Sequence, residues 1–199
     1  MPMLLYGNGM ISGATSMPTN VQFGGTVGVT GALNTSSTFT TSGALTASNG
    51  IAFPATQAAS SNPNTLDDYE EGTWTPAVYG SSNPGVYANL SGANGWYTKI
   101  GREIKASAFI IHGSTFTLSG AYVISGLPFT TSNYGGGGFI SYFANWINQS
   151  PSLFQIEYNQ TYGYLRARNK NDEANQYDLA TSYFQNNTSY MLTILYMTT

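Results

Sequence analysis

The chain contains no cysteine, which excludes disulfides and thiolate metal sites and leaves its redox compartment open. It also has little charge: 8% of its 199 residues are charged, about a third of the share in a typical soluble protein. Aromatic residues, in contrast, reach 14%. A monomer with so few charges would have poor solubility, so we expect copies of the chain to cover part of each other's surface.

A positive field and long hydrophobic runs are missing as well. The formal net charge of −3 offers nothing to attract a polyanion, so we expect no nucleic-acid partner. No stretch approaches the ~18–20 apolar residues of a membrane helix, and we expect no membrane insertion. The N-terminal apolar run is short and lacks a basic residue, unlike a signal peptide.

No local catalytic signature is present. His112 is the single histidine and ends an apolar run, so we expect it to pack in the core. The acidic cluster Asp67, Asp68, Glu70 and Glu71 lacks the alternating spacing of a Ca²⁺ loop, and adjacency in sequence does not place two carboxyls across a sugar. We expect a solvated or Arg-paired turn there, and no catalytic residue, cofactor or metal in the chain.

The charged residues are distributed unevenly, because residues 1–66 contain none and all fifteen follow. The change occurs in the segment Leu66–Pro76, with the sequence LDDYEEGTWTP. Gly72 is expected to permit a sharp bend, and Trp74 to anchor the first strand in the core. This segment therefore predicts a boundary between two kinds of structure.

LDDYEEGTWTP closely resembles a signature near the start of the C-terminal domain of many bacteriophage fibre and tail proteins. Two further segments resemble the same family and follow in its order, namely Gly95–Arg102 (GWYTKIGR) and Ser125–Phe129 (SGLPF). The resemblance covers roughly residues 66–130. It implies a β-rich, homotrimeric component of the virion, and it supplies no catalytic motif.

The N-terminal third divides into two segments. Residues 1–20 mix apolar residues with Gly and Pro, and we interpret them as a virion-attachment segment whose anchor is Met3, Leu4, Leu5 and Tyr6; the alternative is a frayed terminus. Residues 21–65 are rich in Ser, Thr and Gly, with sparse apolar residues that three intertwined chains would bury. This pattern favours a β stalk with a connector, and the alternative is a flexible linker.

Residues 66–199 carry a strand pattern. In Arg102–His112, apolar side chains alternate so that Ile104, Ala106, Ala108 and Ile110 share one face. Similar runs follow, separated by turn signals that include Asn133–Gly138 and Asn159-Gln160. We therefore predict an all-β protein, with an intertwined N-terminal stalk and a C-terminal antiparallel sandwich or jelly-roll head.

Aromatic residues beside Gly, Asn and Gln are the remaining functional signal. Sugar rings stack on aromatic planes while amides bind their hydroxyls, so loops carrying Trp96, Tyr97, Tyr134 and Trp146 are predicted to contact a host-surface glycan. Tyr158, Tyr162 and Tyr164 flank Asn159-Gln160 in a similar pattern. The alternative is that these aromatics pack in the core.

Taken with the resemblance, these features predict a structural subunit of a short homotrimeric phage fibre or spike, located in the virion. Its partners would be its own copies, a capsid or tail protein at the N-terminus, and a host-surface glycan. Two alternatives stay open: a head-decoration fibre on the capsid without an essential receptor role, and a polysaccharide depolymerase.

Overall fold

The computed structural model describes residues 32, 34, 38–56, 60–62, 64–113, 118–146, 153–169 and 172–198. The chain divides into two units, Met1–Gly50 and Ile51–Thr199. In the first unit, residues 38–50 are exposed and form bends and a turn, without a strand. The predicted stalk would form between three chains and stays a prediction. The predicted anchor, Met3, Leu4, Leu5 and Tyr6, lies outside the described residues.

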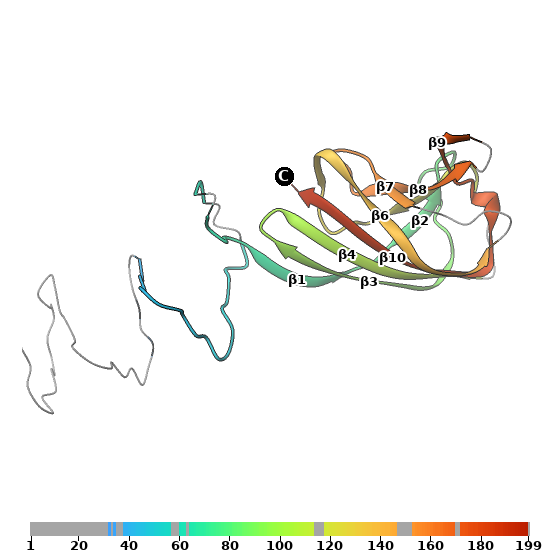
Figure 1. Ribbon diagram of the computed structural model, residues 1–199. Helices are drawn as coiled ribbons and strands as arrows, with labels where there is room; N and C mark the ends of the chain where they lie inside the picture. Colours follow the sequence, from blue (N-terminus) through green and yellow to red (C-terminus); the bar gives the residue numbers. More distant parts are fainter. Residues whose placement is uncertain are drawn as a thin grey trace, which may run out of the picture. The chain divides into compact units, whose positions relative to one another are not determined.

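The second unit is built from β-strands that all pair antiparallel (Figure 1), which confirms the predicted all-β fold class. No helix in the part of the chain that the structure describes has the length and hydropathy of a membrane span. The elements in chain order are β1 (Tyr69–Trp74), β2 (Ala77–Gly80), β3 (Leu90–Ile100), β4 (Glu103–His112), β5 (Tyr122–Ser125), β6 (Thr131–Trp146), β7 (Leu153–Ile156), β8 (Tyr162–Asn169), β9 (Asp172–Asp178), the 3₁₀ turn η1 (Thr181–Tyr183) and β10 (Phe184–Thr198).

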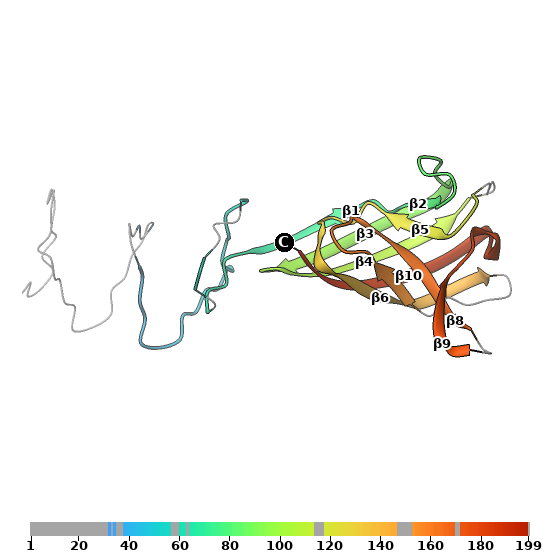
Figure 2. The ribbon, with the colours of Figure 1, turned by 90° about the horizontal axis from the view of Figure 1, so that it is seen from above.

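The strands form one sheet in the order β1-β3-β4-β10-β6-β7-β8-β5-β2, with β9 added beside β8. The sheet curls, so that β1, β3, β4, β10 and β6 form one layer and β7, β8, β5 and β2 lie across from them (Figures 1 and 2). The sequence predicts a sandwich or jelly roll, and the structure has instead one antiparallel sheet that curls into two layers.

The core lies between these layers and follows from the alternation in β4. Ile104, Ala106, Ala108 and Ile110 are each at most 1% exposed, as the sequence predicts. The inward residues of β10 continue this face, and residues of β5, β7 and β8 cover it from the other layer. The core includes Tyr122, Ile124, Phe154, Leu165, Tyr190, Leu192 and Ile194.

The first two segments of the family resemblance lie side by side, because β1 pairs with β3 from Tyr69 opposite Ile100 to Trp74 opposite Gly95. The Trp74 ring covers Gly95, where a Cβ would overlap it, and donates from Nε1 to the Ser107 carbonyl at 3.1 Å. Tyr97 covers Gly72 in the same way. The prediction of a bend at Gly72 is wrong: this glycine lies in an extended strand and makes room for Tyr97.

The acidic cluster is not the solvated turn that the sequence predicts. Glu70 and Glu71 are exposed on β1, but Asp68 is 7% exposed and forms an ion pair with Lys99, which is 5% exposed. Phe129, from the third segment of the resemblance, packs edge-on against Tyr97 and lies 5.6 Å from the Lys99 ammonium. The three segments therefore form one packed cluster.

The four-glycine run Gly135–Gly138 lies within β6, so the turn predicted at Asn133–Gly138 is wrong. This part of β6 pairs with β10 on one side and β7 on the other. A Cβ at Gly138 would overlap the Thr193 carbonyl oxygen, whereas a Cβ at Gly137 would meet only the Phe154 carbonyl oxygen, at 3.4 Å. The glycines allow close approach of the neighbouring backbone instead of a reversal of the chain.

The neighbouring glycines give a matched test. We expect Gly138→Ala to lower the free energy of unfolding by about 2–3 kcal/mol, because a backbone atom of β10 blocks the added methyl group. Gly137→Ala should leave it unchanged or raise it by about 0.5 kcal/mol, since the unfolded chain loses freedom and the site has room. Urea unfolding measures both, and equal losses would contradict the close approach.

Candidate functional site

The candidate site begins with the outward face of β8. Tyr162, Tyr164 and Arg166 lie at alternate positions and are half-buried. The residues between them point into the core and are buried: Gly163, Leu165 and Ala167. This two-residue period places the two phenol rings side by side, with centroids 6.1 Å apart and an interplanar angle of 82°. The strand therefore presents two tyrosines and a guanidinium on one surface.

The turn between β7 and β8 closes one end of this surface. Asn159 adopts a positive φ of 56°, so the turn predicted at Asn159-Gln160 is confirmed. Thr131 fixes the turn from both sides, since its hydroxyl donates to the Glu157 carbonyl at 2.8 Å and accepts from the Gln160 N–H at 3.1 Å. The turn thereby holds Glu157, Tyr158 and Gln160 beside the β8 tyrosines.

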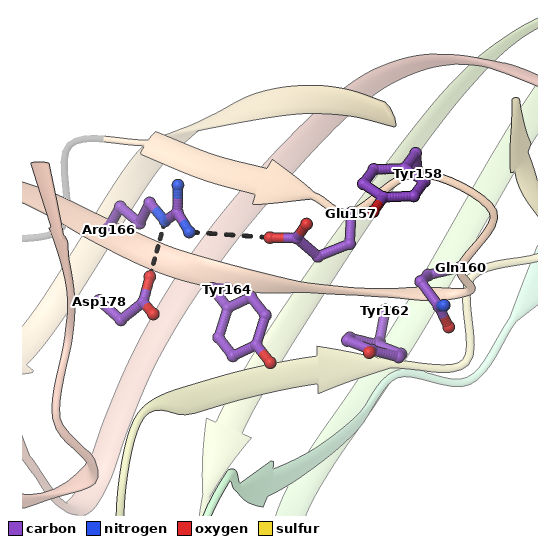
Figure 3. A pocket seen from close by; sticks show the side chains of 7 residues that line it. All are labelled: Glu157, Tyr158, Gln160, Tyr162, Tyr164, Arg166 and Asp178. Atoms are coloured by element: carbon purple, nitrogen blue, oxygen red, sulfur yellow. Dashed lines mark hydrogen bonds and ion pairs between the residues drawn. The ribbon is translucent and has the colours of Figure 1, made fainter. Parts of the chain in front are cut away.

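Arg166 joins three elements at the other end. Its Nε donates to Asp178 Oδ1 at 2.6 Å, because β9 pairs with β8 and places Asp178 opposite Arg166. One terminal nitrogen lies 3.7 Å from Glu157 Oε1 (Figure 3). The other terminal nitrogen donates to Gln155 Oε1. The guanidinium therefore orients two carboxylates and an amide around the tyrosines.

Together these side chains line an open pocket of about 440 Å³. Figure 3 shows the rings of Tyr162 and Tyr164 projecting from the same side of β8. Burial raises the pKa of Tyr164, the negative charges of Asp178 and Glu157 raise it further, and the positive charge of Arg166 lowers it. The phenol is neutral at neutral pH, so its hydroxyl can donate. The lining residues are Glu157, Tyr158, Gln160, Tyr162, Tyr164, Arg166 and Asp178.

Such a lining suits a sugar. Phenol rings offer flat apolar faces, while carboxylate and amide oxygens accept from sugar hydroxyls. Both carboxylates are ion-paired with Arg166, which fixes them as acceptors. No group of three or more His, Asp or Glu side chains that would hold a metal ion occurs among the described residues.

The aromatics predicted to contact a glycan are not gathered in this pocket. Trp96 is 48% exposed on β3, on the surface turned away from the core, while its neighbour Tyr97 packs inward against Phe129. Tyr134 is 94% exposed near the start of β6, and Trp146 ends the same strand, packed against Phe184. All four lie on strands rather than in loops. Their contact with a glycan stays a prediction.

Part of the pocket could be predicted from the sequence. Tyr158, Tyr162 and Tyr164 beside Asn159-Gln160 have the expected pattern of aromatics and amides. Nothing in the local sequence, however, pairs Asp178 with Arg166, since that contact depends on the register of β9 against β8. His112, by contrast, packs as predicted: it is fully buried, with Nε2 2.6 Å from the Tyr122 hydroxyl oxygen.

No protein-family model matches the chain, and no curated protein matches it. Among solved structures, its fold is similar to that of the Dettilon tailspike protein (gp208), with a TM-score of 0.56 and 18% sequence identity. The match covers 65% of this chain and 24% of the tailspike chain. The chain thus spans about a quarter of the length of that protein, and the likeness is one of fold.

Proposed function

We propose that the chain is a structural subunit of a short homotrimeric bacteriophage fibre or spike whose β-sheet domain binds a host-surface glycan in the pocket beside β8. The N-terminal segment with Met3, Leu4, Leu5 and Tyr6 attaches it to a capsid or tail protein of the virion. The observation that carries the binding function is the pocket itself, where Tyr158, Tyr162 and Tyr164 surround hydrogen-bonding groups.

Two observations support a place in the virion. The fold matches part of a phage tailspike, and the three segments that resemble phage fibre proteins pack against one another in β1, β3 and the segment before β6. A head-decoration fibre is compatible with the same features, and the two differ in where the N-terminus attaches. The pocket takes a binding role in this proposal, with Glu157 and Asp178 as acceptors and without a catalytic step.

Truncating a pocket tyrosine tests the glycan proposal. Tyr158→Ala should weaken binding of the purified protein to immobilised host surface polysaccharide by about fivefold or more, because a stacked ring contributes about 1 kcal/mol at each site and three copies multiply the loss. Tyr158 is 63% exposed, so the melting temperature should change little. Surface plasmon resonance and thermal unfolding measure the two quantities.

Tyr134→Ala is the matched control and also tests the competing prediction that Tyr134 contacts the glycan, because Tyr134 is 94% exposed and lines no part of the pocket. Its polysaccharide binding should equal that of the unmodified protein. If Tyr134→Ala weakens binding and Tyr158→Ala does not, the pocket is the wrong site and the glycan lies elsewhere on the sheet. If neither the unmodified protein nor a variant binds the polysaccharide, the receptor role fails.

A further inference from the structure

The outward surface of the layer formed by β1, β3, β4, β10 and β6 exposes many large apolar side chains, with Ser and Thr between them. Register places Trp96, Ser107, Thr193 and Phe139 in one row across β3, β4, β10 and β6, since directly paired residues share a face. The rows on either side contain more apolar side chains. Eight large ones on this surface are between 39% and 52% exposed: Tyr69, Trp96, Ile100, Phe139, Tyr142, Met191, Leu195 and Met197.

The size of this surface, which we call the outer face, is unusual for a monomer. Half-exposed side chains of this size leave on the order of 700 Å² of apolar surface in total, close to the ~800 Å² that each partner contributes to a standard interface. A soluble monomer rarely exposes a contiguous apolar patch of more than a few hundred Å². The outer face therefore has the area of one side of a stable protein–protein contact.

Charge on the outer face is sparse and of both signs. Thr98 on β3 lies between Lys105 on β4 and Glu71 on β1. Glu103 lies two residues before Lys105 on β4. These three charges occupy one end, while the rows through Trp96 and Phe109 carry none. A surface with an uncharged centre and both signs at its end is compatible with a second copy of itself, because neither sign dominates.

We infer that the outer face is the surface through which copies of this chain associate, an inference that rests on the proposed oligomeric fibre. It assigns the exposed Trp96 to contact between subunits and leaves the pocket beside β8 open to solvent on each copy. Glu71, Lys105 and Glu103 would lie at the rim, where ion pairs between copies set the register.

The absence of cysteine in the sequence allows a test by labelling. In the full chain, Leu195→Cys on the outer face should react with a maleimide slower by about tenfold or more than Val86→Cys, because association covers it. Leu195 and Val86 are both 50% exposed in the single chain, and Val86 lies in the segment between β2 and β3, away from the outer face. Equal labelling rates in an assembled oligomer would overturn the inference.

A charge placed on the outer face provides a second test. Met191→Glu should shift the sedimentation coefficient at micromolar concentration from an oligomer toward a monomer, whereas Val86→Glu should not, because association would bury the new carboxylate unpaired. If both variants stay oligomeric, the outer face is not the interface, although the trimer stands. If the unmodified chain is a folded monomer, the inference and the trimer both fail, and the polysaccharide assay still tests the pocket.

Discussion

Replacing Lys99 with methionine is expected to destabilise the β-sheet domain by about 3–5 kcal/mol, because the change leaves a buried carboxylate without its partner. Asp68 and Lys99 are 7% and 5% exposed, and their ion pair lies beside the Phe129 ring. Methionine preserves the aliphatic volume of the lysine, so the loss reports on charge rather than on packing. Urea unfolding at a fixed protein concentration measures it.

The control for this prediction is the double variant Asp68→Asn with Lys99→Met. Removing both charges also removes the unpaired carboxylate, so the double variant should be more stable than Lys99→Met alone. If Lys99→Met lowers the free energy of unfolding by less than about 1 kcal/mol, the pair behaves as an exposed surface ion pair. The description of the three segments as one packed cluster would then be wrong.

Acid should destabilise the domain through His112. This side chain is fully buried, in contact with Tyr122, Phe184 and Tyr190, and burial lowers its pKa from 6.5 to about 4. Between these two values the unfolded chain binds a proton that the folded chain does not. The free energy of unfolding attributable to His112 is therefore complete above pH 6.5 and falls by about 3 kcal/mol as the pH drops to 4.

Other groups also titrate in this range, so the variant His112→Gln isolates the contribution. Glutamine keeps a polar group facing Tyr122 but does not titrate, and both Tyr122 and Tyr190 stay neutral because burial raises the pKa of each. We expect the difference in unfolding free energy between unmodified protein and variant to shrink by about 3 kcal/mol from pH 7 to pH 4. A constant difference would show that His112 is accessible to protons in the folded state.

The parts of the fold that follow from local pattern were predictable. In β4 the alternation of apolar residues identifies the buried face because one side of the strand meets the core and the other does not. Trp74 and His112 were likewise predicted to pack, since an aromatic at the start of a strand and a lone histidine on an apolar strand have few other roles. Both are buried.

The errors share one cause, which is that glycine and aspartate were interpreted locally. Gly72 was predicted to permit a bend and Gly138 to lie in a turn, but each makes room for a side chain or backbone of a neighbouring strand. Asp68 was predicted to be solvated with the rest of its cluster, but it is buried and pairs with Lys99, 31 positions later in the sequence. Only the register of β1 against β3 brings these residues together.

The candidate site depends on tertiary structure in the same way. The tyrosines around Asn159-Gln160 were visible in the sequence, whereas the ion pair of Arg166 with Asp178 requires the β8–β9 pairing. The segments around Trp96 and Tyr134 have the composition expected of sugar-binding loops, but both residues lie on strands. Composition therefore indicated the kind of chemistry and did not identify the residues that converge.

The central claim, that this chain is a projecting component of a virion, is tested most directly by locating it on the particle. Electron microscopy of intact particles with a bound antibody fragment raised against residues 66–199 should show label on projections from the capsid or tail. The same preparation distinguishes a tail fibre from a head-decoration fibre by the position of the label. Purified particles that carry neither label nor the chain itself, by mass spectrometry, would contradict the account.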